Sequence, residues 1–150
     1  MENKILKYSF LICLFFSSYF LSQTKKINFL IMIDEKPCLI VNDLLISSPS
    51  IGLLDVNYIV GTIDLSDENY NKLANDKSLN FNISFETFLP KFPLAQKYVF
   101  SLPKEFLNQK YIIVNIFNKG SKIYRKRYSG GNKNKEYYIV ITSPDFSKLD

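Results

Sequence analysis

The sequence predicts an all-β fold, a two-sheet antiparallel sandwich of about seven or eight strands with one short helix. The composition favours strands, because 10 Tyr and 13 Phe stand against only 5 Gly. Short segments of alternating apolar and polar residues recur along the chain, with turn residues between them. Helical periodicity is confined to one short segment. A closed β-barrel is the alternative arrangement of the same strands.

The strands are assigned from alternation and from β-branched or aromatic content. The clearest is 79–86, where Phe81, Ile83 and Phe85 alternate with polar residues. Ser66 precedes a segment with acidic residues in its first turn, which predicts a capped helix over 67–75. In chain order, strands are expected at 27–33, 38–46 (38–41 and 44–46 forming one strand interrupted by a turn at Asn42-Asp43), 56–63, 79–86, 98–102, 111–117, 122–128 and 137–142, followed by a loose tail.

The first 22 residues predict a cleavable signal peptide, and 23–150 then form a single β-sandwich domain. Lys4 and Lys7 precede an apolar stretch that ends at Leu21, which is shorter than the roughly 20 residues of a membrane span. The ending Phe20-Leu21-Ser22-Gln23 resembles signal peptides of Bacteroidetes-type bacteria, which often cut just before a Gln. We therefore expect an exported protein, periplasmic or extracellular, with no transmembrane span after signal removal.

Ordinary catalytic chemistry has little support in this sequence. The chain contains no His, which removes the commonest general base and the usual zinc ligand. Cys38 is the single Cys after the signal peptide and is expected to be a buried apolar residue. No cofactor or metal site is predicted, and the protein is expected not to be an enzyme. A carboxylate-based hydrolase remains an alternative, since two acids suffice, and Asp64 and Glu86 lie at strand ends.

The basic run at 119–135 is the strongest candidate for a binding site. It contains seven basic residues and no acid, and it follows a turn at Asn118-Lys119-Gly120 that predicts a hairpin. Basic groups interleaved with Tyr suit an acidic protein, an acidic polysaccharide or a lipid headgroup. The other interpretation is an edge strand whose cations prevent self-pairing. The candidate binding residues on the returning strand are Lys122, Arg125, Arg127 and Tyr128.

The function expected from these observations is a non-enzymatic binding or assembly module in the cell envelope or outside the cell. A net charge of +5 is too small to predict nucleic-acid binding. A second alternative is a carrier that holds an apolar small ligand in a β-walled cavity, since the many aromatic residues would suit such walls. The molecular function and the identity of any partner are not fixed by the sequence.

Overall fold

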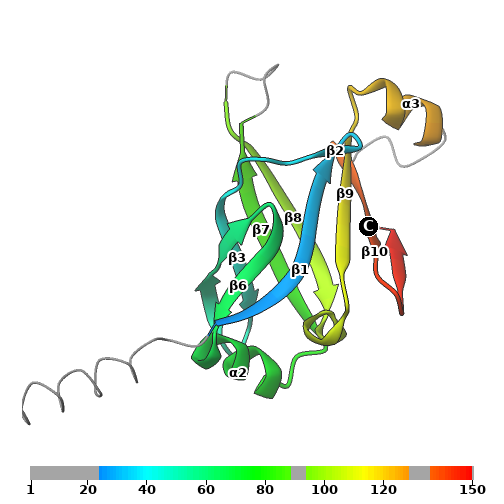
Figure 1. The fold of residues 1–150 in the computed structure, drawn as a ribbon. Helices are drawn as coiled ribbons and strands as arrows, with labels where there is room; N and C mark the ends of the chain where they lie inside the picture. Colours follow the sequence, from blue (N-terminus) through cyan, green and yellow to red (C-terminus); the bar gives the residue numbers. More distant parts are fainter. Residues whose placement is uncertain (1–23, 89–93, 129–135, 150) are drawn as a thin grey trace, which may run out of the picture.

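The computed structural model describes residues 24–88, 94–128 and 136–149, which form two β-sheets packed face to face (Figure 1). The predicted signal peptide lies outside the described residues. Sheet A has six strands in the order β11-β10-β9-β1-β6-β5, and β2 pairs with β1 as a seventh. Its strands are β1 (Thr24–Ile33), β2 (Lys36–Pro37), β5 (Asn57–Ile59), β6 (Gly61–Ser66), β9 (Ile112–Asn118), β10 (Tyr137–Thr142) and β11 (Ser147–Leu149).

Sheet B is the smaller layer and follows the order β4-β3-β7-β8. All of its neighbouring strands are antiparallel. A register shift between Asn42 and Leu45 marks a bulge in its second strand, beside Asp43 with a positive φ of 49°. The strands of sheet B are β3 (Asn42–Ser48), β4 (Gly52–Asp55), β7 (Asn80–Thr87) and β8 (Gln96–Pro103).

The predicted all-β sandwich is confirmed, because the described strands form two separate sheets rather than a closed barrel. Several details differ from the prediction. Residues 38–41 are not a strand, and the predicted strand 56–63 is divided into β5 and β6 by a turn at Val60, with Gly61 at a φ of 91° as the first residue of β6. The tail after Pro144 is not loose, since β11 pairs with β10. One pair, β1 with β9, is parallel, so sheet A is mixed.

The core lies between the sheets and is filled by aromatic and β-branched side chains. On β1 the alternate residues Phe29, Ile31 and Ile33 point inward, as strand geometry requires. Phe81 and Phe85 of β7 meet them from sheet B and are almost fully buried. Cys38 is also buried, as predicted, with its thiol within hydrogen-bonding distance of the Thr87 hydroxyl.

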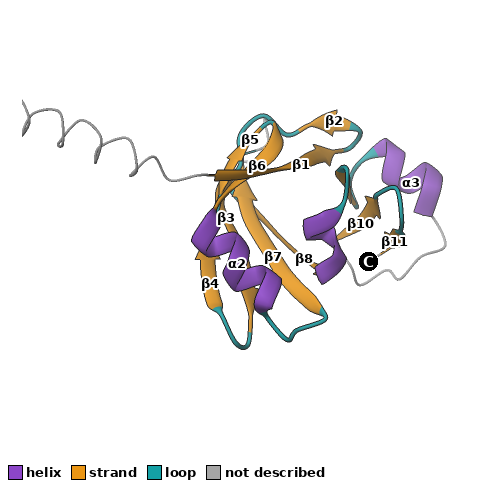
Figure 2. Cartoon of the chain, turned by 60° about the horizontal axis from the view of Figure 1, so that its bottom comes forward, coloured by secondary structure: helices purple, strands orange, loops and turns teal. Residues whose placement is uncertain are grey.

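Two helical segments close the lower end of the sandwich as drawn in Figure 1, and Figure 2 shows them side by side. The predicted helix is confirmed as α2 (Asp67–Asn75), with the Ser66 hydroxyl accepting from the Asn69 amide at 3.2 Å. The 3₁₀ helix η1 (Lys104–Asn108) follows β8 directly. Leu73 of α2 and Phe106 of η1 are fully buried in the core. The described helices include none long and apolar enough to cross a membrane.

The segment 122–128, predicted as a hairpin strand, is the helix α3 (Lys122–Tyr128). Ser121 is the local cause, because its hydroxyl accepts from the Tyr124 amide at 3.0 Å. Its carbonyl accepts from the Arg125 amide, which forms the first turn. The basic segment is therefore not an edge strand, and the interpretation of its cations as protection against strand pairing is wrong.

Candidate binding surface

The helical conformation of α3 changes which cations share a side. In a strand, Arg125 and Arg127 would lie on one face with Lys122 on the other. In a helix, residues three and four apart are neighbours, so Lys122, Arg125 and Lys126 share one side. All three side chains are exposed, and none of them forms an ion pair within the described part of the chain. Arg127 and Tyr128 belong to α3, but their side chains lie outside the described residues.

Aromatic packing attaches α3 to sheet A. Tyr124 is buried with Phe117 of β9 and Tyr138 of β10, and the Tyr124 and Tyr138 rings stack with centroids 5.2 Å apart. Phe117 points away from the main core, because the core-facing residues of β9 are Val114 and Ile116. The helix therefore covers one end of the outer face of sheet A and presents its cations beside that face.

The rest of this outer face is mainly apolar and only partly buried, with Val140 packed against the Tyr124 cluster at its edge. Strand pairing places Leu30 beside Ile113, and Met32 beside Asn115, which in turn pairs with Val140. The apolar members of these rows are half-buried rather than enclosed. From the sequence alone, these apolar residues are most simply interpreted as core residues of strands that are buried on both sides. The structure instead leaves these side chains partly exposed, although the side-chain oxygen of Asn115 among them is buried.

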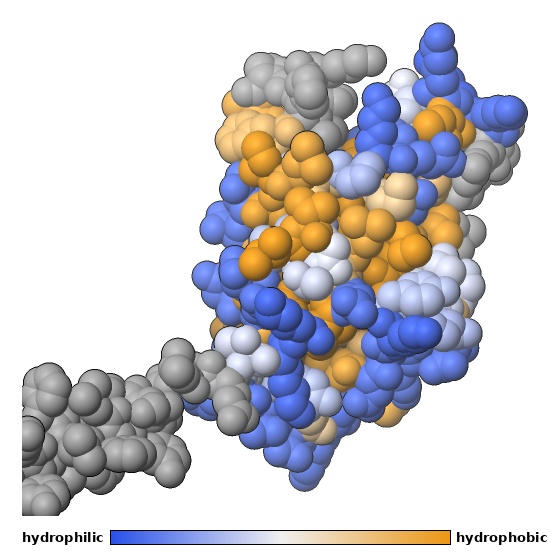
Figure 3. Space-filling view, in the orientation of Figure 1, coloured by the Kyte–Doolittle hydropathy of each residue, from blue (hydrophilic) through white to orange (hydrophobic). Residues whose placement is uncertain are grey.

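Two segments extend the apolar area beyond β1. One is the β5–β6 turn, where Ile59 and Val60 are exposed, and the other is the loop after β2. Leu39 and Ile40 follow β2 and have 74% and 61% of their surface exposed. This loop is held against the end of β7, since the Thr87 hydroxyl donates to the Ile40 carbonyl at 2.5 Å. Figure 3 shows apolar side chains gathered over the upper part of this face, with hydrophilic residues below. We call this area the outer apolar face; its residues are Leu30, Met32, Leu39, Ile40, Ile59, Val60, Ile113 and Val140.

Hydrogen bonds of the Tyr98 and Tyr137 hydroxyls link β8 to sheet A near α3. The Tyr98 hydroxyl donates to Asn118 Oδ1 at 2.9 Å, and burial raises the pKa of Tyr98 to about 12. The Tyr137 hydroxyl accepts from the Val99 amide and donates to the Val99 carbonyl. The Asn118 amide donates to Asp34 Oδ1 at 3.1 Å, which occupies that carboxylate. These hydrogen bonds hold β8 against β9 and β10, the two strands on which α3 packs.

The opposite end of the sandwich carries a polar cluster centred on Asp76. Its carboxylate accepts from the hydroxyls of Ser48 and Ser50 and from the Ser78 amide, at 2.5–2.6 Å. These three hydrogen bonds, in that order, hold the pKa of Asp76 well below its usual range. The Lys104 ammonium donates to the Asp76 carbonyl. The cluster ties the end of α2 to the β3–β4 turn and to η1, which gives it a structural role.

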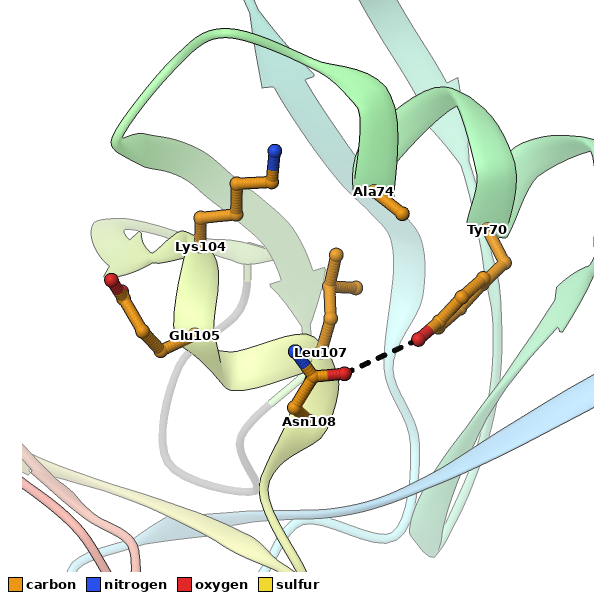
Figure 4. A pocket seen from close by; sticks show the side chains of 6 residues that line it. All are labelled: Tyr70, Ala74, Lys104, Glu105, Leu107 and Asn108. Carbon is orange, nitrogen blue, oxygen red and sulfur yellow. Dashed lines mark hydrogen bonds between the residues drawn. The ribbon is translucent and has the colours of Figure 1, made fainter.

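A pocket of about 220 Å³ lies between α2 and η1 (Figure 4). The Tyr70 hydroxyl donates to Asn108 Oδ1 across it at 3.4 Å, and the Lys25 ammonium lies 3.7 Å from the centre of the Tyr70 ring. The volume is below the range typical of small-molecule sites, roughly 300–1,000 Å³. The pocket is a groove between two packed helices rather than an interior cavity.

A larger cleft of about 420 Å³ is lined by Asp43 and Asp55. Both carboxylates are exposed to water, whereas paired-carboxylate catalysis requires one acid to stay protonated in an apolar environment. The two acids noted at strand ends lie in different sheets, Asp64 on β6 of sheet A and Glu86 on β7 of sheet B. Within the described ranges, no group of three or more acids and Cys could hold a metal ion.

Comparison of the chain with protein-family models, with curated proteins and with solved structures finds no match. The class of the protein therefore comes from its own fold, an all-β sandwich with a mixed sheet and a basic helix on one face. The surface that combines α3 with the outer apolar face is the candidate site. Sequence analysis found the cations of this site. It missed the apolar half of the site, because Leu39 and Ile40 were interpreted as part of a buried strand. Pro37, just before them, was the signal in the sequence that a strand ends there.

Proposed function

We propose that this protein is a non-enzymatic, exported binding module that holds an anionic partner on α3 and the adjoining outer apolar face. The observation that carries the proposal is the arrangement of Lys122, Arg125 and Lys126 on one side of α3, beside uncovered apolar side chains. Clustered cations attract acidic partners, and apolar area strengthens the contact once it forms. The predicted signal peptide supplies the export part of the proposal.

The packing of the core supports surface binding over the carrier alternative. The described aromatic residues fill the space between the sheets, and Phe29, Phe81 and Phe85 are each about 1% exposed or less. The pocket between α2 and η1 and the Asp43/Asp55 cleft were described above, and a further pocket lies on sheet B and reaches Phe85. Each of the three is lined largely by polar or charged residues or by partly exposed side chains. A carrier of an apolar ligand would need its cavity among those Phe side chains.

The test is retention on two immobilised soluble polyanions, alginate as an acidic polysaccharide and polyglutamate as an acidic polypeptide. In the α3 variant, Lys122, Arg125 and Lys126 are changed to Gln. In the control variant the same net charge is removed at the opposite end by changing Lys26, Lys77 and Lys110, all exposed, to Gln. The α3 variant should elute at clearly lower salt than the control on at least one polyanion. Equal elution of both variants would show that only net charge matters, and the proposed function would be wrong.

A further inference from the structure

We propose that the partner of this surface is an anionic phospholipid bilayer, on which α3 contacts headgroups while the outer apolar face enters the boundary of the acyl chains. This inference rests on the proposed function and names the class of partner. Protein surfaces bind bilayers in this way when exposed apolar side chains lie next to cations, because burial of the apolar side chains and attraction to anionic headgroups both contribute to the binding free energy.

Charge complementarity is the first argument. The end of the molecule that carries α3 also carries Lys36 on β2 and Lys119 in the turn before α3. The described acids close to α3 are Asp34, Glu35 and Glu136, and Asp34 is bonded to Asn118. Asp43, Glu86 and Lys97 lie at the same end of the molecule on sheet B. The excess of positive charge is therefore concentrated on α3, whose three exposed cations attract a negatively charged surface. Each cation near an anionic bilayer adds to binding independently.

The shape of the apolar area is the second argument. Leu39 and Ile40 stand out from a loop, and Val60 stands at the tip of the β5–β6 turn, so the apolar side chains project rather than line a groove. A folded protein partner would need matching hollows for such projecting groups, because stable interfaces are packed as densely as protein interiors. Lipid chains are fluid and need no matching shape. Projecting Leu, Ile and Val beside Lys and Arg therefore favour a bilayer.

A second copy of this chain is a poorer occupant on electrostatic grounds. Each copy brings the same three cations of α3, and the whole chain has a net charge of +5. Two outer apolar faces placed together would bring these positive groups close and leave them without neutralising partners. An anionic polysaccharide would account for the cations but leave the Leu and Ile side chains in water.

The experiment uses the protein purified as the cell processes it, with its N-terminus determined by mass spectrometry. Binding is measured by cosedimentation with vesicles of phosphatidylcholine, with and without phosphatidylglycerol. The α3 variant and its Lys26/Lys77/Lys110 control are those described above. The apolar variant is Leu39→Ser with Ile40→Ser. Its control is Leu53→Ser with Leu79→Ser, at positions that are equally exposed on other parts of the surface.

The unaltered protein should bind phosphatidylglycerol vesicles and lose binding as salt rises. Neutralising the three cations of α3 should weaken binding about a hundredfold, at roughly fivefold per cation. The Leu39/Ile40 variant should weaken it about tenfold or more. Both control variants should bind within about twofold of the unaltered protein, allowing for general surface charge.

Four outcomes would overturn the proposal. Equal binding by the Leu39/Ile40 variant and its Leu53/Leu79 control would show that the apolar face does not enter the bilayer. Absence of vesicle binding, together with α3-dependent retention on polyanions, would exclude the bilayer and leave the proposed function standing. A dimer in analytical ultracentrifugation that dissociates in the Leu39/Ile40 variant would assign the face to a second copy. Loss of α3 dependence on both vesicles and polyanions would overturn the proposed function as well.

Discussion

The two ends of the sandwich use charged and polar residues in opposite ways. At the end closed by α2 and η1, the Asp76 carboxylate is bonded to two Ser hydroxyls and an amide, and Lys104 donates to a carbonyl. At the end that carries α3, Lys122 and Arg125 are exposed and form no ion pair among the described residues. Exposed apolar side chains occur at both ends, with Leu53 and Leu79 at the first and Leu39 and Ile40 at the second.

This contrast indicates which end is available for interaction. Buried polar groups with full sets of hydrogen bonds stabilise the fold and have no capacity left for a ligand. Exposed cations beside exposed apolar residues contribute little to the fold, since even exposed ion pairs are worth only about 0–1 kcal/mol. Variants at the two ends should therefore separate stability from binding.

The largest effect on stability is expected from Phe106→Ala at the closed end. Phe106 is fully buried and its ring meets Phe81 edge to face, with centroids 6.0 Å apart. Removing the ring should lower the free energy of unfolding by about 3–5 kcal/mol, because it leaves a cavity under η1. Urea denaturation measures the change, with exposed Leu79→Ala as the control. A loss no larger than that of the control would mean that η1 is not part of the cooperative core.

A smaller, pH-dependent effect is expected from Asp76→Asn. The pKa of Asp76 is lowered in the folded state by the bonds from Ser48, Ser50 and Ser78. The carboxylate therefore stabilises the fold above its unfolded pKa of 3.8 and loses that contribution as the pH falls through the lower folded value. The difference in unfolding free energy between the unaltered protein and the variant should be full at neutral pH and shrink below about pH 4. A pH-independent difference would contradict this, and Asp55→Asn at an exposed site is the control.

The smallest effect on the free energy of unfolding is expected from removing the serine that caps α2 or the serine that caps α3. Ser66 caps α2 and Ser121 caps α3, each through its hydroxyl. Ser66→Ala should lower the global free energy of unfolding by about 1 kcal/mol, because α2 contributes Leu73 to the core. Ser121→Ala should instead speed amide hydrogen exchange within α3 and leave global unfolding within about 0.5 kcal/mol. Equal global losses would show that both ends belong to one cooperative unit.

Local signals made the strands of the core and α2 predictable. Phe81, Ile83 and Phe85 alternate with polar residues, so one face of β7 had to be buried. Ser66, followed by Asp67 and Glu68, is a helix start that needs no tertiary contact. These elements were therefore assigned correctly from the sequence.

The binding surface was predicted only in part, because its conformation depends on contacts between distant segments. Ile123 and Tyr124 suit a strand by propensity, whereas the Ser121 cap and the packing of Tyr124 on Tyr138 favour a helix. Similarly, Leu30 looks like a core residue, since the sequence of β1 does not reveal whether a further layer covers its outer side. The β1–β2 turn places Asp34 and Glu35 at positive φ without the Asn or Gly that usually marks it.

The parallel pairing of β1 with β9 has a consequence for the order of folding. β1 is the first described strand, and its partner follows late, as shown by the bond from the Asn28 side chain to the Lys110 carbonyl across 82 residues of sequence. Contacts of such long range form slowly, because the intervening chain must first be brought together. An emerging chain can therefore pair β1 with β6 early, whereas its second neighbour β9 arrives only after most of the sequence has been made.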